Sequence, residues 1–600
     1  MAPDRAGSLG SRWRRAAIVL AAPFLVAWSD PDFHVRVNHE LAPGFTVGGW
    51  VQDPSGRRLI YGVRDPGPVP RTRQLFSAAA DGSQDVLALT DPMSDSRYIL
   101  LWEIARQGNR VVVMANLDVD ERFELYSFTT DGARVPVKLS PPLPPDEEVS
   151  TLFALTPDGS RVLFLTGDTR ITHFTLRSVP IDGSEPAVVI HEPEPQISGF
   201  LTPRSTADSL HVVYPSRDFR TSKRLHCARV DGSSAPLQIS PSFEALDPDE
   251  DYLLSSDGKW IVLHSRTVGG SDVFSVKVDG SEPPRSLFFP RSSGRAIQIA
   301  AASPQAFQIS PDGQHVAGIA GLYHSEIRVA PIDGSAPPVV LKGLNDLYLK
   351  HFRFSGGGRL VFRADLRGEP GLFTVPMDGS APHVRIHGFR RHQAWANKFE
   401  VSPAGDVVFD GYLDGSWRLF TVPIDGGTPA HQLHPDMATG GNVYNANSTN
   451  GRSFLMSPDG EWLLYLADQE QDEVKELFAV APDGSPAVRK MNGPLPPGGD
   501  VVSHAFARDS RRVFYGVWTS TTRDVYTSVI HDDGGARQPA GEDSPIVSEH
   551  AVKMEVAGLE QSTVLDDATW RAIDRENALA LFPRFADAAA PRAQGAVRSR

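Results

Sequence analysis

Short hydrophobic runs separated by turn residues recur along most of this chain. In one stretch the runs are Leu152–Leu155, 161–165, Phe174–Val179 and Ala187–Ile190. Each run is short for a helix, contains β-branched or aromatic residues and is bounded by turn residues, which favours strands. The pattern therefore predicts four short antiparallel strands in every stretch of about 50 residues, with little helix between them.

Two recurring turns mark the same two places in each stretch. The first turn separates the first two runs and reads Ser/Thr-Pro-Asp-Gly in its clearest copies, at 156–159, 310–313 and 457–460. The second turn separates the last two runs and contains Asp-Gly, most clearly at 179–184, 330–335, 375–380 and 422–427. Together with weaker copies, these turns define ten units of nearly constant period.

The residues of these turns suit hairpins. Proline at the second position of the first turn presets φ for a type I turn, and the glycine can take the left-handed conformation that returns the chain into a hairpin. Asp-Gly in the second turn is also a favourable hairpin pair. We therefore expect both turns to join antiparallel neighbours.

Repeated four-stranded units of this kind predict an all-β fold, a β-propeller of about ten four-stranded blades. Because propellers commonly have about 4–8 blades, ten units predict either one unusually large ring or two tandem rings divided near Phe288–Ser303. The even period and the lack of a long linker favour the single large ring over two tandem rings. The strand that closes the first blade onto the last could come from Phe33–Val37 or Ala551–Val556.

The succession of Ser-Pro-Asp-Gly, a β-run with Phe or Tyr, Leu-Phe-x-Val and Asp-Gly-Ser resembles the TolB-type repeat. This repeat is also found in the propellers of the prolyl oligopeptidase family and of the tricorn protease. The resemblance covers about residues 45–550. A prolyl oligopeptidase relative would carry a Gly-x-Ser-x-Gly nucleophile elbow, which this sequence lacks. The resemblance thus implies a propeller without a peptidase domain, and the TolB propeller itself binds partner proteins.

The amino terminus is typical of an export signal. Residues 1–29 hold four arginines ahead of a mainly apolar run from Ala16 to Trp28, with small residues before a cut at Asp30. An uncleaved anchor or a buried helix is the alternative, although the run is short for a membrane span. The prediction is a cleaved signal peptide and a periplasmic or secreted protein with no stable membrane span.

The composition of the chain restricts the classes of molecule that it could bind. The net charge is −14, and loss of residues 1–29, which carry a net +3, would make it −17; this acidity argues against nucleic acid as a partner. The single cysteine, Cys227, excludes an intramolecular disulfide and is expected to pack in a strand. The propeller is predicted over 30–557. Residues 558–600 are expected to form a short helix and a disordered tail.

Motifs for catalysis or cofactor binding are absent from the sequence. There is no phosphate loop, no Cys-x-x-Cys pair and no His-Glu-x-x-His zinc motif, so no cofactor is expected. His383, His387 and His392 lie close together, but their spacing fits no recognised ligand set. We therefore expect solvated loop histidines there, and no metal.

Polar residues in the runs before the first turn are the candidate ligand-binding residues. The first strand of each propeller blade lines the central channel, and alternate side chains face it. The candidates are His351, Arg353, Lys398, Glu400 and His504, and Gln308 has the same character. They could form a polar funnel for a ligand, or they could only solvate a wide channel.

These observations favour a non-catalytic extracytoplasmic scaffold that binds a protein, peptide or glycan partner. Trp395, Trp417 and Trp518 could anchor such a partner or could fill blade cores. The alternative is an enzyme with its site in the channel, such as a metal-dependent polysaccharide lyase or glycosidase. Some TolB-type propellers are oligouronide lyases, and that function would require His351, His504 and His324 to converge on one metal.

Overall fold

Antiparallel strands make up the regular structure of the described residues, and no helix occurs among them. The computed structural model describes residues 34–530 except 68, 84, 95, 169–173, 193–196, 201–202, 219–222, 240–251, 268–269, 289–306, 321–325, 342–343, 345–346, 367–368, 390–397, 445–453 and 486–487. The predicted signal peptide and the predicted carboxyl-terminal helix and tail lie outside these residues. The all-β class is confirmed.

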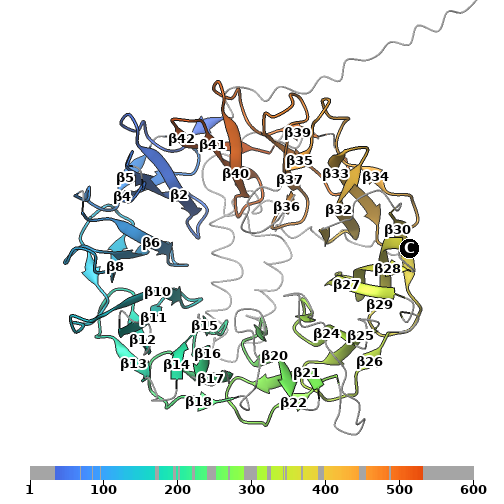
Figure 1. The fold of residues 1–600 in the computed structure, drawn as a ribbon, viewed down its shortest axis with the longest axis horizontal. Coiled ribbons are helices and arrows are strands. Elements are labelled where there is room, and N and C mark those ends of the chain that lie inside the picture. The colour runs from blue at the N-terminus through green and yellow to red at the C-terminus, as the bar shows by residue number, and fades with distance from the viewer. Residues whose placement is uncertain are drawn as a thin grey trace, which may run out of the picture. The chain divides into compact units, whose positions relative to one another are not determined.

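Most strands are joined in chain order into sheets, as Figure 1 shows. The largest sheet contains β2 (Thr46–Gln52), β3 (Arg58–Arg64), β4 (Thr72–Ala79), β5 (Val86–Ala88), β6 (Ile99–Ile104), β7 (Arg110–Ala115), β8 (Glu124–Thr129) and β9 (Val137–Lys138). It consists of two four-stranded groups, β2–β5 and β6–β9. One residue pair, Thr72 with Ile99, joins these groups.

The following sheets repeat the four-stranded pattern. They contain β10 (Glu147–Leu155), β11 (Arg161–Asp168), β12 (Phe174–Pro180) and β13 (Val188–His191); β14 (Ile197–Phe200), β15 (Arg204–Ser205), β16 (His211–Asp218), β17 (Lys223–Arg229) and β18 (Leu237–Gln238); and β19 (Tyr252–Leu254), β20 (Trp260–Thr267), β21 (Gly270–Lys277) and β22 (Arg285–Ser286). The five-stranded member has a first strand in two pieces, β14 and β15, which both pair with β16.

The pattern continues through the second half of the chain. The strands are β23 (Phe307–Ile309), β24 (His315–Ala320), β25 (Glu326–Pro331) and β26 (Val339–Val340); β27 (Leu347–Phe354), β28 (Arg359–Leu366), β29 (Glu369–Pro376) and β30 (Val384–Gly388); β31 (Phe399–Val401), β32 (Asp406–Leu413), β33 (Ser416–Pro423) and β34 (His431–Gln432); β35 (Val443–Tyr444), β36 (Phe454–Met456), β37 (Leu463–Ala467), β38 (Glu476–Val480) and β39 (Arg489–Lys490); and β40 (Asp500–Phe506), β41 (Arg512–Trp518) and β42 (Arg523–Val529).

The last sheet takes its fourth strand from the beginning of the described chain. β1 (Val35–Arg36) pairs antiparallel with β42, with Val35 opposite Thr527. Asn38, which is fully buried, extends this contact: its Oδ1 accepts from the Val525 N–H at 2.8 Å, and its Nδ2 donates to Asp524 at 2.8 Å. Of the two candidates for a closing strand, the amino-terminal segment thus supplies it. The other lies outside the described residues.

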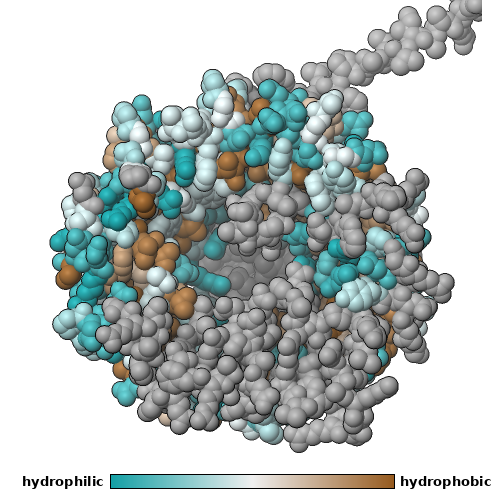
Figure 2. All heavy atoms as spheres, in the orientation of Figure 1, coloured by the Kyte–Doolittle hydropathy of each residue, from teal (hydrophilic) through white to brown (hydrophobic). Residues whose placement is uncertain are grey.

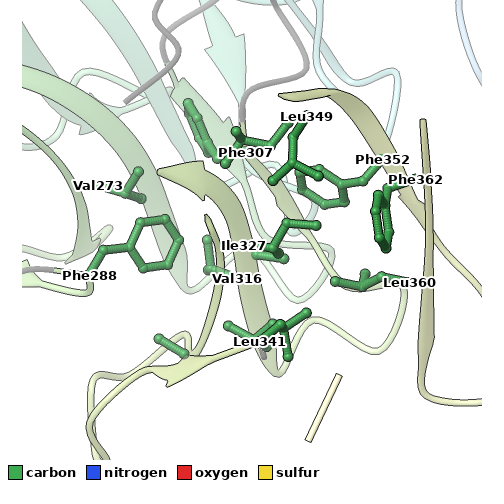
Figure 3. Close-up of a cluster of buried hydrophobic side chains, with 14 of the residues drawn as sticks. Val273, Phe288, Phe307, Val316, Ile327, Leu341, Leu349, Phe352, Leu360 and Phe362 are labelled. Atoms are coloured by element: carbon green, nitrogen blue, oxygen red, sulfur yellow. The ribbon is translucent and has the colours of Figure 1, made fainter. Parts of the chain in front are cut away.

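The middle strands of each sheet form the core. The central five residues of β3, β28 and β41 are buried without alternation, because neighbouring sheets cover both of their faces. Figure 3 shows one such cluster, in which Val273, Phe307 and Phe362 come from three successive sheets. The first strand β2, by contrast, has one buried residue, Val47, and its other residues are half-buried or exposed. The repeat of the sequence therefore corresponds to a repeat of sheets that share their cores.

Both recurring turns form as expected. In the first turn of the third unit, Gly159 has φ +68° and donates its N–H to the Thr156 carbonyl at 2.8 Å. The Thr156 hydroxyl donates to Asp158 at 2.6 Å and accepts from the Arg161 N–H at 3.0 Å. Since the strands are antiparallel, both turns of a unit lie at one end of its sheet, here called the turn end. The links between second and third strands, and between successive sheets, lie at the opposite connection end.

Cys227 packs in a strand, as expected. It lies in β17, buried with Val213 and Leu225 in one cluster, and burial raises the pKa of its thiol to about 12. A protonated, buried thiol is a packing group and a poor nucleophile. Within the described part of the chain, no helix has the length and apolar character needed to cross a membrane.

Candidate functional site

Four of the five candidate residues lie in or directly next to two neighbouring first strands, β27 and β31. Arg353 in β27 and Glu400 in β31 occupy equivalent positions, two residues before their first turns. Arg353 Nε lies 3.5 Å from Glu400 Oε2, and both side chains are partly exposed. Because the two strands belong to successive sheets, the ion pair links these sheets.

Polar residues at the same position of other first strands also contact the next sheet. Gln308, on β23, donates from Nε2 to the Phe352 carbonyl on β27 at 2.8 Å. Arg204, on β15, donates to the Tyr252 carbonyl on β19 at 3.2 Å, and its guanidinium lies 4.7 Å from the Tyr252 ring. The polar row along the first strands is therefore engaged in contacts between sheets, a role that neither sequence interpretation included.

His351 is a half-buried neighbour of the ion pair. Its ring stacks on Phe399 of the next sheet at 4.9 Å between centroids and 20° between planes. Burial, together with the nearby Arg363 and Arg353, lowers the pKa of His351 to about 3. The imidazole is thus neutral near pH 7 and is not poised for proton transfer there.

Lys398 immediately precedes β31, the strand that contains Glu400. Its backbone N–H donates to the buried Asp410 carboxylate at 3.0 Å, and its ammonium lies 5.6 Å from the Phe454 ring of the following sheet. The structure therefore brings His351, Arg353 and Glu400 together where two first strands meet, whereas the Lys398 ammonium faces the next sheet.

His504 lies elsewhere, on β40, and is buried. It stands opposite Tyr515, three residues before its first turn, where other first strands carry rings such as Phe352 and Phe399. Neither ring nitrogen has a hydrogen-bond partner among the described residues, and burial lowers the pKa of His504 to about 4. This histidine occupies a core position of its sheet, separated from β27 by the sheets of β31–β34 and β35–β39.

The described histidines do not form a metal-ligand set. No group of three His, Cys, Asp or Glu side chains suited to a metal occurs among the described residues, and His324 and His392 lie outside them. His383 packs edge-on against Phe373 at 5.4 Å. His387 packs against Phe409 at 4.9 Å, and burial lowers its pKa to about 4. Both histidines thus contact aromatic core residues, which corrects the expectation of solvated loop positions.

The connection end carries a feature that the sequence interpretation found only in part. Exposed or half-exposed aromatic rings there lie against a cation: Trp518 with Arg523 at 4.0 Å, Tyr348 with Lys350 at 4.1 Å, Tyr98 with Arg71 at 4.2 Å and Tyr444 with Lys475 at 5.0 Å. Trp518 and Tyr348 are 38% and 41% exposed. Aromatic residues next to Arg or Lys in the non-repeated links were the signal available in the sequence.

The three tryptophans considered from the sequence differ in the structure. Trp518 is exposed, whereas Trp417 packs edge-on against Tyr412 at 5.6 Å beside a core cluster, and Trp395 lies outside the described residues. Figure 2 shows hydrophilic and hydrophobic residues intermingled on the described part of the visible face. Single exposed aromatic rings therefore distinguish candidate binding positions better than the distribution of hydrophobic residues does.

Comparisons with known proteins add little to this geometry. No family model and no curated protein matches the chain. Similar solved structures include a prolyl endopeptidase (13% identity, 63% of this chain and 55% of that chain, TM-score 0.30), dipeptidyl peptidase 4 of Porphyromonas gingivalis (11%, 78% and 64%, 0.39) and the tricorn protease (13%, 84% and 47%, 0.28). The chain thus spans less than two thirds of each peptidase. Likeness at this level assigns neither family nor activity.

Proposed function

We propose that this chain is a non-catalytic, extracytoplasmic binding protein that recognises a protein, peptide or glycan partner at its connection end. Its scaffold in this proposal is a TolB-type propeller of about ten blades in a single ring, without a peptidase domain. The extracytoplasmic location, periplasmic or secreted, rests on the signal-peptide character of residues 1–29.

The way in which successive sheets meet supports the single ring. Hydrophobic clusters connect each sheet to the next along the described chain. A further cluster joins the last sheet to the first, with Phe514 and Val525 packed beside Val47 and Leu59. Two tandem rings would instead place a closing contact within each half of the chain. The pairing of β1 with β42 spans both halves.

The observation that carries the binding function is the set of cation-contacted aromatic rings at the connection end. A ring such as Trp518, held by Arg523, exposes a large surface whose ordering on binding costs little entropy. Aromatic and arginine side chains are also the types that contribute most energy to protein interfaces. By contrast, the polar residues of the first strands already contact the neighbouring sheet.

The test compares binding by the wild-type full chain, by a W518A/Y348A variant and by L210A, using a peptide library and a glycan array. Leu210 is a matched control because it is 45% exposed but lies in a first turn, at the opposite end. We expect at least one class of ligand to bind, with affinity about tenfold lower in W518A/Y348A, or about 1.4 kcal/mol, and unchanged in L210A. Binding that depends on Leu210 and not on the two rings, or no binding in either collection, would contradict the proposal.

A further inference from the structure

A pocket of about 310 Å³ lies at the connection end of the first sheet. The link from β1 to β2 forms one wall, with His39 and Phe45, and β4 contributes Phe76. Val63 and Met93 extend the apolar lining. Small-molecule sites commonly measure about 300–1,000 Å³, so this pocket is large enough for one substantial side chain and its adjoining peptide groups.

The charged groups of the pocket are engaged with one another or with the backbone. Asp65 accepts from Arg73 Nε at 2.7 Å and from the Arg71 N–H at 2.8 Å. Arg73 Nη1 also donates to the carbonyls of Ser94 and Arg97 at 2.8 and 2.6 Å. Because these bonds lie within the protein, the polar wall is preorganised and the lining that faces a ligand is largely apolar.

His39 adds a directed hydrogen-bond donor. Its Nδ1 lies 2.6 Å from the hydroxyl of the fully buried Tyr61, and that hydroxyl also accepts from the His39 backbone N–H at 3.3 Å. Burial raises the pKa of Tyr61 to about 12 and lowers that of His39, so both groups are neutral. The tyrosine proton then has only Nδ1 as its acceptor among the described residues. When the tyrosine donates that proton to Nδ1, the proton of the neutral imidazole resides on Nε2.

A short series of contacts links one wall of the pocket to the exposed ring that carries the proposed function. Asn38, the residue before His39, bonds to Asp524, and Asp524 follows Arg523, which contacts Trp518. Gln74 also lines the pocket, and its Nε2 donates to the Thr90 carbonyl at 2.8 Å. A largely apolar lining with the polar groups of His39 and Gln74 suits a side chain next to a peptide carbonyl better than a sugar, whose hydroxyls would need several polar partners.

We propose that this pocket binds one apolar side chain, preferably aromatic, of a peptide segment whose carbonyl oxygen accepts the Nε2–H of His39. The inference rests on the proposed function, because it specifies the peptide class of partner and the place where it is anchored. The walls of the site are His39, Phe45, Val63, Phe76 and Met93.

The test uses the full chain labelled with ¹³C-methyl methionine, titrated with N-acetyl-tryptophan amide. The chain has eight methionines, so the Met93 signal is assignable with M93L. We expect a saturable shift of Met93. Skatole, which has the same apolar body without the carbonyls, should bind several-fold more weakly. Methyl β-glucoside should leave the signal unchanged. A response to the glucoside alone, or to skatole as strongly as to the amide, would overturn the assignment.

Substitutions at the rim provide the matched control. Ala42 lines the pocket and is exposed, and Ala336 is equally exposed in a second turn at the opposite end. We expect A42W to weaken binding of N-acetyl-tryptophan amide about tenfold, or about 1.4 kcal/mol, and A336W to leave it unchanged. The other methionine signals report whether each variant is folded. Equal binding by A42W and wild type would overturn the pocket as the site.

The two proposals fail separately. If Met93 responds to none of the probes while a partner still binds through Trp518 and Tyr348, the pocket inference is wrong and the proposed function stands. If Met93 responds to the amide but neither collection yields a partner, the pocket is supported and the wider binding function is contradicted.

Discussion

The turn end and the connection end of the same sheets use polar residues in opposite ways. At the turn end, the Asp158 N–H donates to Ser209 of the next first turn at 2.9 Å, and the Asp459 N–H donates to Ser510 at 3.2 Å. Repeated residues there bond to one another, within a turn and between turns. At the connection end, residues such as Trp518 do not repeat and remain exposed.

This difference separates stability from recognition. A turn residue that satisfies its neighbour's backbone has little hydrogen-bonding capacity left for a ligand, and its removal leaves a backbone group unpaired. A non-repeated ring at the connection end contacts one cation and offers its other face to solvent. We therefore expect substitutions at the turn end to change the free energy of unfolding, and substitutions at the connection end to change binding.

The largest effect is expected at a first-turn glycine. Gly460 has φ +76°, and a Cβ there would lie 2.2 Å from Pro403 of the preceding first turn. G460A should lose about 1–2 kcal/mol from the left-handed backbone and about 1–3 kcal/mol more from the overlap. Gly358, with φ +67° and open space around it, is the control that should lose the backbone contribution alone. Equal losses in urea unfolding would show that neighbouring turns are not tightly packed.

The next effect tests how much the buried hydrogen bonds of Asn38 stabilise the closing strand. N38A would leave the Val525 N–H and Asp524 without their partner, which should cost about 2–3 kcal/mol. Asn492 is also buried, donates to the Gly493 carbonyl and accepts from the Leu477 N–H at 2.7 Å. Because these contacts lie within one unit, N492A is the matched variant. A loss below about 0.5 kcal/mol in N38A would mean that the closing strand contributes little to stability.

A third substitution separates a candidate binding residue from a core residue. H504F replaces two unpaired ring nitrogens by the residue type found at Phe352, and we expect a gain of about 1–3 kcal/mol. F352H is the reciprocal control and should lose stability. If His504 has a functional partner, H504F should instead abolish binding without a gain in stability.

The same variant should have a distinct pH dependence. The folded pKa of His504 is about 4, below its usual 6.5, so between these values the unfolded chain binds a proton that the folded chain does not. Stability is therefore lost as pH falls from 6.5 towards 4, by up to about 1.4 kcal/mol per pH unit for this ring. The advantage of H504F should grow over that window. An advantage equal at pH 7 and pH 5 would contradict the buried neutral histidine.

The smallest effect concerns the Arg353–Glu400 pair, which belongs to neither end. Both side chains are partly exposed and the closest atoms are 3.5 Å apart, so a double-mutant cycle with R353A and E400A should give a coupling of about 0.5 kcal/mol. Ligand binding should not change. A coupling of several kcal/mol, or a loss of ligand binding, would indicate that the first strands form a functional site.

Sequence reasoning was strong where the chain repeats and weak where it does not. The turns at Gly159 and Gly313 are predictable because they depend on local conformation: glycine suits the position with positive φ, and proline suits the second position, where φ is negative. The polarity of Arg353 was visible, but its contact with Glu400 depends on how sheets meet. The channel position predicted for His504 depends on alternation along its strand, and alternation cannot show which face a single polar residue takes.

A hydrophobic residue followed by a polar residue marks the end of the closing strand, as it does in other fourth strands. Val37-Asn38 follows β1 as Met491-Asn492 follows β39 and Leu139-Ser140 follows β9, and in each case the polar side chain accepts an N–H at the start of the adjacent third strand. Aligning the ends of fourth strands would therefore have identified residues 35–38 as a displaced fourth strand. The pocket beside His39 required the three-dimensional course of the link that follows.

The pairing of β1 with β42 also sets the order in which the molecule can be completed. Asp158 and Ser209 are 51 residues apart, whereas Asn38 and Asp524 are separated by 486. Neighbouring sheets can thus assemble while the chain is being synthesised, but β1, the first of the described strands to be made, waits for β42, the last of them. Until then β42 has an unpaired edge that another chain could occupy. Late completion of this sheet makes the two distant ends of the described chain the point at which misassembly and domain swapping are most to be expected.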